Sequence, residues 1–307
     1  MMQPNLTVLL RAEVQRLRFE GTRVCGVEFS SEGAAHRVRA ECEVILSLGA
    51  INTPKILMLS GIGDEHQLMR HGIARVQHLP GVGQNFQDHI LVAGCVWEYR
   101  TPEAPRNNSA EFTFFSKSSI ELPTPDLQPV LEECAFGNEL TRRQYELPSD
   151  PSAAWTLAPG LVRPESRGRV ELTGCRPEDR VAVHANFLSD RRDLAALTHA
   201  VELCREIGNS PHLKAFARRE LMPGPQNAAD REQWIRRASG TYFHQSGTAK
   251  MGRDPMSVVD GSLRVYGVQG LRIADGSVMP AITTGNTMAP CVMIGERAAE
   301  LILRSSQ

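Results

Sequence analysis

A histidine and an asparagine near the C-terminal end of the chain place the strongest constraint on how it can fold. His244 lies in a segment of small and polar residues that is punctuated by Gly247 and Gly252, and Asn286 directly precedes a segment with helical spacing of apolar residues. A histidine in such a loop and an asparagine beside a helix start form a polar pair of the kind that lies over a reactive planar ligand. The fold therefore has to bring these two segments together.

His244 is the first candidate for chemistry. Taken alone, a histidine is more often a hydrogen-bonded structural residue than a catalytic one. The setting favours function, because Gly247, Thr248 and Gly252 supply backbone freedom and small side chains that leave room for a flat ligand beside the imidazole. Imidazole titrates near pH 6.5 and can take a hydroxyl proton at neutral pH, so we predict His244 to be a general base.

Asn286 has two interpretations that are compatible. Its place between Gly285 and Thr287, before a helix, is typical of an N-cap. Its amide could also hold an alkoxide or a substrate hydroxyl, while the N–H groups at the helix start face an anion or a polar carbonyl. We therefore predict Asn286 as a second site residue.

Charge and cysteine usage exclude several classes of partner. The 34 basic and 35 acidic residues give a net charge of −1, and no run of like charges reaches the length of about five or six that marks a charged block. Nucleic acid and anionic membrane surfaces are therefore not expected as partners, and no apolar run is long enough to span a membrane. The seven cysteines are scattered and form no C-x-x-C pair, which favours a reducing cytoplasmic location over a disulfide framework.

The first part of the chain reads as a small sheet followed by helices. Strand-like runs occupy 6–10, 24–29 and 44–48. Thr53 and Pro54 are expected to open a helix, because threonine suits the cap and proline the first helical position.

The middle of the chain predicts an antiparallel sheet covered by helices. Residues 91–190 are rich in proline and contain β-like stretches at 169–173 and 181–187. Apolar residues recur at helical spacing from 190 to 207, so one face of that helix is expected to cover the sheet. A last helix is expected at 290–304. Together with the first part, this pattern predicts an α/β (α+β) fold.

Several catalytic motifs are absent. The chain contains no G-x-G-x-x-G, since the stretch that starts at Gly81 has Phe86 in place of the last glycine, and it contains no Walker A sequence or H-E-x-x-H. Asp88 and His89 have no partner at metal-ligand spacing. We therefore expect no metal site, and we expect this pair to close a loop by hydrogen bonds.

Three segments carry a resemblance to a known family. Residues 49–63 run from a Gly-Ala pair through an apolar helix to Gly-Ile-Gly, residues 79–89 read Leu-Pro-Gly-Val-Gly-Gln-Asn-Phe-Gln-Asp-His, and residues 242–252 contain His244. They resemble the second signature, the Leu-Pro-Gly-Val-Gly-x-Asn-Leu-Gln-Asp-His loop and the catalytic histidine segment of the glucose–methanol–choline family of flavoprotein oxidoreductases. The resemblance runs over essentially the whole chain.

The resemblance implies an activity, a cofactor and site residues. Members of this family bind FAD and oxidise an alcohol carbon by hydride transfer to the flavin, with a histidine and a second histidine or asparagine above the ring. By position, this implies a small-molecule alcohol substrate and a catalytic pair of His244 and Asn286. The implied FAD-binding residues are Val14, Asp275, Gly276, Asn286 and Thr287.

The chain also departs from the family pattern, because it lacks the strand–G-x-G-x-x-G–helix unit with which members begin. The resemblance therefore implies an incomplete Rossmann-like FAD-binding domain at 1–89, an antiparallel-sheet substrate domain at 90–240, and a return to the FAD-binding domain at 241–307. Independent FAD binding is not expected, so an N-terminal FAD-binding segment or a partner chain is the expected complement. Two alternatives stay open, namely a truncated or split fragment that is inactive alone, and an FAD-containing enzyme that cleaves cyanohydrins without net redox.

Overall fold

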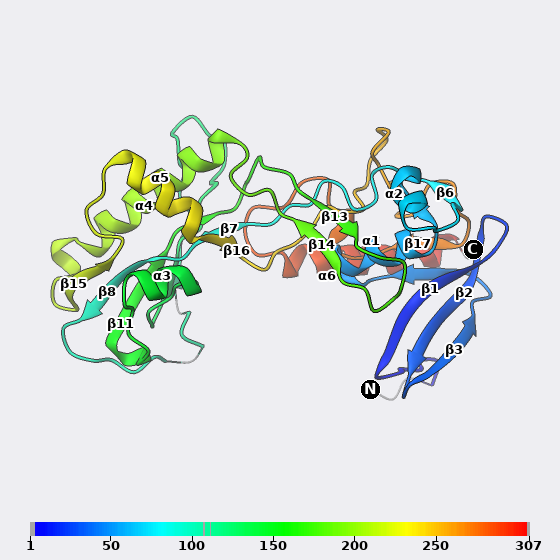
Figure 1. Ribbon diagram of the computed structural model, residues 1–307, viewed down its shortest axis with the longest axis horizontal. Helices are drawn as coiled ribbons and strands as arrows, with labels where there is room; N and C mark the ends of the chain where they lie inside the picture. Colours follow the sequence, from blue (N-terminus) through cyan, green and yellow to red (C-terminus); the bar gives the residue numbers. More distant parts are fainter. Residues whose placement is uncertain (1–3, 107, 111, 306–307) are drawn as a thin grey trace.

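The computed structural model describes residues 4–106, 108–110 and 112–305 of the 307-residue chain. Figure 1 shows an elongated molecule with two lobes: the N- and C-terminal parts of the chain share one lobe, and most of the middle of the chain forms the other. The mixed α/β class with antiparallel sheets confirms the prediction from the sequence.

The first lobe combines a three-stranded antiparallel sheet with two pairs of parallel strands. Its strands are β1 (Ala12–Glu20), β2 (Arg23–Ser31), β3 (Ala34–Arg39), β4 (Val44–Leu46), β5 (Ile62–Gly63), β6 (Gln77–His78) and β17 (Leu271–Ile273). Its helices are α1 (Gly49–Leu59), α2 (Glu65–Arg70), the short 3-10 helix η3 (Gly276–Val278) and α6 (Met288–Ser305). Strands β1, β2 and β3 pair in that order, whereas β4 pairs in parallel with β17, which comes much later in the sequence.

The prediction of a strand at 6–10 is wrong. These residues are described outside any strand, and Leu6 and Leu10 are 53% and 80% exposed. The first strand starts at Ala12 and pairs with β2. An apolar run alone therefore misplaced the strand, because its side chains have no partner surface in the described part of the chain.

Helix α1 begins earlier than Thr53, so the expected helix start is also wrong. It starts at Gly49, and Pro54 lies inside it. Proline has no N–H to donate to the carbonyl of Ala50, four residues earlier. The hydroxyl of Thr248 donates to that carbonyl at 2.7 Å instead, so a residue from a distant segment replaces the missing hydrogen bond of the helix.

The second lobe is a five-stranded antiparallel sheet covered by helices. Its strand order is β15–β8–β11–β10–β9, with bounds β8 (Cys95–Tyr99), β9 (Phe112–Thr113), β10 (Val130–Glu132), β11 (Ala154–Ala158) and β15 (Ala217–Met222). The helical segments are α3 (Glu139–Gln144), η1 (Pro151–Ala153), α4 (Arg191–Gly208), η2 (Pro211–Leu213) and α5 (Ala228–Ala238). Helix α4 confirms the helix expected at 190–207, and its apolar stripe, including Leu197 and Val201, is fully buried in the core of this lobe.

The β-like stretches at 169–173 and 181–187 do not join that sheet. They form a separate antiparallel hairpin of β13 (Arg169–Leu172) and β14 (Val181–His184). Leu172 and Val181 pack into the core of the first lobe, close to α1 (Figure 1). The middle of the chain therefore contributes to both lobes.

A small sheet connects the two lobes where the chain crosses between them. Strand β7 (Ile90–Val92) lies between β12 (Gly160–Leu161) and β16 (Ser239–Thr241), and both pairings are antiparallel. Thr241 lies opposite Ile90. The residues just before β7 and just after β16 are consequently neighbours.

The domain boundaries after residues 89 and 240 stay predictions. One buried apolar cluster draws all its members from within 90–240, and the other draws most of its members from the first and last segments. Leu172 is a member of the second cluster, so the substrate-domain segment as predicted also packs on the FAD-binding part. Among the residues described, no helix is long and apolar enough to cross a membrane.

Candidate active site

Three segments, 85–89, 241–248 and 279–286, meet at His244. The small connecting sheet brings the first two together. Strand β7 begins directly after His89, and β16 ends three residues before His244. The backbone N–H of Tyr242 donates to the carbonyl of His89 at 3.1 Å. The pairing of β7 with β16 therefore places segment 85–89 beside segment 241–248.

Segment 85–89 also holds the third loop, residues 279–286. The side-chain amide of Gln87 donates to the carbonyl of Pro280 at 3.2 Å and accepts from the backbone N–H of Ile282 at 3.1 Å. Its backbone exchanges two hydrogen bonds with Ser246. The amide of Asn85 donates to Gly247 and Pro280. One segment therefore joins both chain regions that carry the predicted catalytic pair.

Gly247 has a different role from the one predicted for it. Its φ is +88°, and a Cβ placed there would lie 2.5 Å from the backbone oxygen of Asn85. A glycine is required because the two loops approach closely at a left-handed backbone position. The space beside Gly247 is filled by protein, so it does not leave room for a ligand.

Asp88 holds the backbone of His244 in place. Its carboxylate accepts hydrogen bonds from the backbone N–H of His244 at 2.9 Å, from the amide of Gln245 at 3.1 Å and from the hydroxyl of Thr241. Burial raises the pKa of Asp88, while these three donors and the backbone N–H of His89 oppose that shift. The expectation that Asp88 closes a loop by hydrogen bonds is confirmed.

The side chain of His244 lies between an amide and a second imidazole. Its Nε2 is 3.3 Å from Nδ2 of Asn286, and its Nδ1 is 2.9 Å from Nδ1 of His89. The amide of Gln128 donates to Oδ1 of Asn286 at 3.0 Å. The structure therefore brings the predicted pair, His244 and Asn286, into contact.

Burial keeps the ionisable groups of this cluster uncharged near neutral pH. It lowers the pKa of His89 to about 4, and the positive charge that His244 can carry adds to the shift. Burial also lowers the pKa of His244 and raises the pKa of Tyr242 to about 12. The rings of Tyr242 and His244 lie 5.0 Å apart, so a neutral imidazole that can accept a proton lies against an aromatic ring.

The predicted FAD-binding residues lie in two places. Asn286 and Thr287 directly precede α6, and a Cβ at Gly276 would lie 3.3 Å from Sγ of Cys291 in the first turns of that helix. Asp275 caps η3, because one of its oxygens accepts from Ser277 N at 2.7 Å. These residues surround the start of α6.

Asp275 also ties α1 to this region. Its other carboxylate oxygen accepts from the backbone N–H of Gly49 at 3.0 Å and from the hydroxyl of Thr53 at 2.6 Å. Both oxygens are therefore engaged by protein donors, which places the start of α1 next to η3.

Val14 lies apart from the other predicted site residues. It is on β1 and lines a cavity of about 260 Å³ between the β1–β2–β3 sheet and β4. The residues that line this cavity do not include His244, Asn286 or Asp275. The structure does not bring Val14 together with the catalytic pair.

Two residues of the cluster were not predicted as site residues from the sequence. His89 was expected only to close a loop, and Gln128 was not singled out. Their partners lie 155 and 158 positions away, and no local pattern marks them. The one available signal for His89 was that it follows Asp88 directly at the end of segment 79–89.

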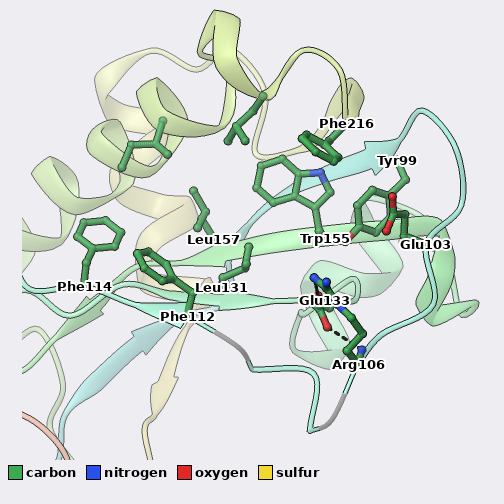
Figure 2. A pocket seen from close by; sticks show the side chains of 12 residues that line it. Tyr99, Glu103, Arg106, Phe112, Phe114, Leu131, Glu133, Trp155, Leu157 and Phe216 are labelled. Atoms are coloured by element: carbon green, nitrogen blue, oxygen red, sulfur yellow. Dashed lines mark hydrogen bonds and ion pairs between the residues drawn. The ribbon is translucent and has the colours of Figure 1, made fainter.

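A larger cavity lies elsewhere, on the helix side of the five-stranded sheet. Figure 2 shows its aromatic lining, including Tyr99, Trp155 and Phe216, and the ion pair of Arg106 with Glu133 at its rim. Its volume is about 500 Å³. Trp155 and its strand neighbours at alternate positions face this cavity, whereas Val130 and Ala158 face Tyr242 on the other side. The sheet therefore separates this cavity from His244.

In the part of the chain that the structure describes, no group of three or more histidine, cysteine, aspartate or glutamate side chains could hold a metal ion. All seven cysteines are free thiols.

Comparison with known proteins matches this chain to one family. Two family models, both described as GMC oxidoreductase, match residues 1–91 and 164–295. The chain belongs to the GMC oxidoreductase family. The matched ranges include His89, His244 and Asn286, whereas Gln128 lies between the two ranges.

Curated GMC relatives include dehydrogenases of alcohols. The chain is 36% identical to an alcohol dehydrogenase (acceptor) of Pseudomonas putida, over 98% of this chain and 59% of that protein. It is also 36% identical to the mitochondrial choline dehydrogenase of Mus musculus, over 98% of this chain and 54% of that protein. The chain thus spans little more than half the length of these relatives.

Solved structures of oxidases share the fold. A pyridoxine 4-oxidase from Mesorbium loti matches with a TM-score of 0.89 and 31% identity, over 94% of this chain and 56% of the oxidase. A formate oxidase from Aspergillus oryzae, described for its FAD modification, matches with a TM-score of 0.86 and 25% identity, over 98% of this chain and 61% of the oxidase. Both oxidases are also much longer than this chain.

Proposed function

We propose that this chain provides the catalytic pair and the substrate domain of an FAD-dependent oxidoreductase that oxidises the CH–OH group of a small-molecule alcohol. The observation that carries the proposal is the contact between Nε2 of His244 and the amide of Asn286, 3.3 Å apart at the start of a long helix. Relatives named as alcohol and choline dehydrogenases support the class of substrate.

The residues around this pair fit a flavin. Helix α6 has 18 residues, and its first N–H groups lack partners within the helix, so its start favours an electron-rich carbonyl or an anion. Asn286 and Met288 are exposed beside the half-buried Thr287, which leaves their surface open to a planar group. The proposed contacts to FAD are Asn286 and Thr287 near the ring, and Asp275, Gly276 and Val14 further along the cofactor.

The residues of this chain would prepare the alcohol for oxidation. Nε2 of His244 takes the hydroxyl proton, and the Nδ2 amide of Asn286 donates to the alkoxide oxygen that forms. Bound FAD supplies the acceptor for the hydride that leaves the carbon. Asp88 keeps the base in position through the backbone of His244.

We further propose that FAD binding requires an N-terminal FAD-binding segment or a partner chain. Apart from isolated bridges, the parallel pairing in the described residues consists of β4 with β17 and the short pair β5 with β6. A dinucleotide is held where a glycine-rich turn joins a strand of a larger parallel sheet to a helix. The exposed apolar side chains of α6, among them Val292 and Leu303 at 58% and 68% exposure, support a further contact surface on this lobe.

The test is the variant His244→Ala in flavin-loaded protein. Removal of a general base should slow anaerobic reduction of the flavin by an alcohol by about 10² to 10⁴-fold. Stopped-flow absorbance would measure this rate, and His212→Ala is a control because His212 is an exposed histidine elsewhere in the second lobe.

Unchanged reduction in His244→Ala would contradict the role of this residue. Cleavage of a cyanohydrin without flavin reduction by any alcohol would contradict the redox function and favour the lyase alternative.

A further inference from the structure

We propose that His89 is a positioning residue that holds His244 in the Nδ1–H tautomer, so that the lone pair on Nε2 faces Asn286 and the substrate. This inference rests on the proposed role of His244 as a base. His89 does not touch the substrate in this scheme, because it acts through the ring of His244.

The backbone carbonyl of Thr283 can only accept a hydrogen bond. Nε2 of His89 lies 3.0 Å from the carbonyl oxygen of Thr283. A carbonyl has no proton to give, so Nε2 of His89 must carry the hydrogen of this bond. The side chain of His89 is fully buried, which favours the neutral ring. A neutral His89 with a proton on Nε2 has a bare lone pair on Nδ1.

The contact between His89 and His244 then allows only one placement of the shared proton. The two Nδ1 atoms are 2.9 Å apart, which is a hydrogen-bond distance and requires one proton between them. Since Nδ1 of His89 has none, the proton belongs to Nδ1 of His244. The other nitrogen of His244, Nε2, is therefore the acceptor in the neutral ring.

The amide side of the cluster agrees with this assignment. The amide of Gln128 donates to Oδ1 of Asn286 at 3.0 Å, which leaves Nδ2 of Asn286 to donate to Nε2 of His244 at 3.3 Å. All four hydrogen bonds, from Gln128 to Thr283, then point in one direction along the cluster. The opposite tautomer of His244 would place two N–H groups against each other at Asn286 and two lone pairs against each other at His89.

The hydrogen bond between His244 and His89 also stabilises the protonated form of His244. When Nε2 of His244 takes a proton, the ring becomes an imidazolium, and its Nδ1–H bond to His89 becomes a charge-assisted hydrogen bond. The groups packed against His89 are His244, Tyr242 and the backbones of Thr283 and Val162. His89 thus both selects the tautomer of the base and stabilises its protonated form.

The first experiment reads the tautomers directly. Long-range ¹H–¹⁵N correlation spectra of the full chain, labelled with ¹⁵N-histidine at pH 7.5, distinguish protonated from bare ring nitrogens. We expect Nδ1–H and bare Nε2 for His244, and the reverse for His89. His78 is an internal reference, because its Nδ1 accepts from the backbone N–H of Glu65 at 3.3 Å.

Two variants distinguish a positioning role of His89 from a purely structural role. His89→Phe removes the acceptor, and the single tautomer of His244 should be lost. His89→Asn offers an amide oxygen near the place of Nδ1 and should restore the Nδ1–H tautomer. In flavin-loaded protein, His89→Phe should slow flavin reduction roughly 10-fold or more, below the full contribution of a general base, and His89→Asn should recover part of that loss.

The proposal would be overturned by a bare Nδ1 on His244 in the parent chain, or by an unchanged tautomer in a folded His89→Phe variant. The spectra do not depend on flavin chemistry. If the tautomers are as expected but no alcohol reduces the flavin, the proposed function fails while the assignment of the ring protons stands.

Discussion

At the scale of single residues, the site combines two neutral imidazoles with a hydrogen-bonded carboxylate. Burial favours the neutral rings of His89 and His244, whereas the carboxylate of Asp88 accepts from donors that include the backbone N–H of His244. Phe243, directly before the base, has a φ of +62° and a side chain that is 78% exposed. A bulky residue seldom adopts this left-handed conformation, so backbone strain lies next to the proposed base.

The lowered pKa of His89 predicts acid sensitivity of the fold. The ring is neutral in the folded protein down to about pH 4 and titrates near 6.5 in the unfolded chain. The stabilisation is therefore complete above pH 6.5 and is lost as the pH falls towards 4. Between pH 7.5 and pH 5 this group should cost about 2 kcal/mol of unfolding free energy, measured by chemical denaturation at both pH values.

The comparison variant for this prediction is His89→Gln, which keeps a polar group near Thr283 and cannot titrate. Its loss of stability between the two pH values should be smaller than that of the parent chain by about the same 2 kcal/mol. An equal pH dependence in both proteins would show that the titration of His89 does not contribute. His244, Tyr242 and Asp88 surround His89 and are unchanged in both proteins, so their titration largely cancels in the comparison.

Residue identity alone predicted part of this site. His244 and Asn286 could be found because glycines and a helix start mark their surroundings. His89 and Gln128 could not, because a hydrogen bond between residues more than 150 positions apart leaves no periodic trace. The roles of His244, Asn286 and the FAD contacts stay predictions.

At the scale of elements, long periodic segments were predictable and exact starts were not. The helix at 190–207 follows from its apolar spacing and is found as α4. Helix α1 begins four residues before Thr53, since tertiary contacts tolerate the proline inside it. The hairpin of β13 and β14 packs on the other lobe, which sequence patterns of strands do not reveal.

The proline in α1 predicts a specific coupling with Thr248. In Thr248→Val, the carbonyl of Ala50 loses its donor in a buried place, which should cost about 1–3 kcal/mol of unfolding free energy. In the background of Pro54→Ala, the new backbone N–H can donate to the same carbonyl, and the cost of Thr248→Val should fall by about 1 kcal/mol. Urea denaturation of the four proteins measures this cycle.

Additive effects of the two substitutions would contradict this account of α1. Thr248→Ser supplies the matched control, because it keeps the hydroxyl and removes only a methyl group. It should lose less stability than Thr248→Val if the hydrogen bond to Ala50 is the main contribution.

At the scale of the whole molecule, the two lobes meet at the proposed site. The chain crosses between lobes at His89 and again at Thr241, and β7 and β16 pair at these crossings. An antiparallel sheet was predicted from the middle of the chain, and the five-stranded sheet of the second lobe is built from that part. The pairing of β4 with β17 could not be predicted, since a parallel pair of distant strands depends on the rest of the sheet.

The limited parallel sheet leads to the last prediction, which concerns the cofactor. In the described residues the parallel strands β4 and β17 are three residues long, and no larger parallel sheet extends from them to support a dinucleotide along its whole length. After incubation with excess FAD and desalting, the chain alone should therefore show no flavin absorption in the visible range. Addition of an N-terminal FAD-binding segment from a GMC relative should restore the bands. Retained flavin in the chain alone would contradict the need for a partner, and it would show that the start of α6 and the residues around Asp275 suffice to hold the cofactor.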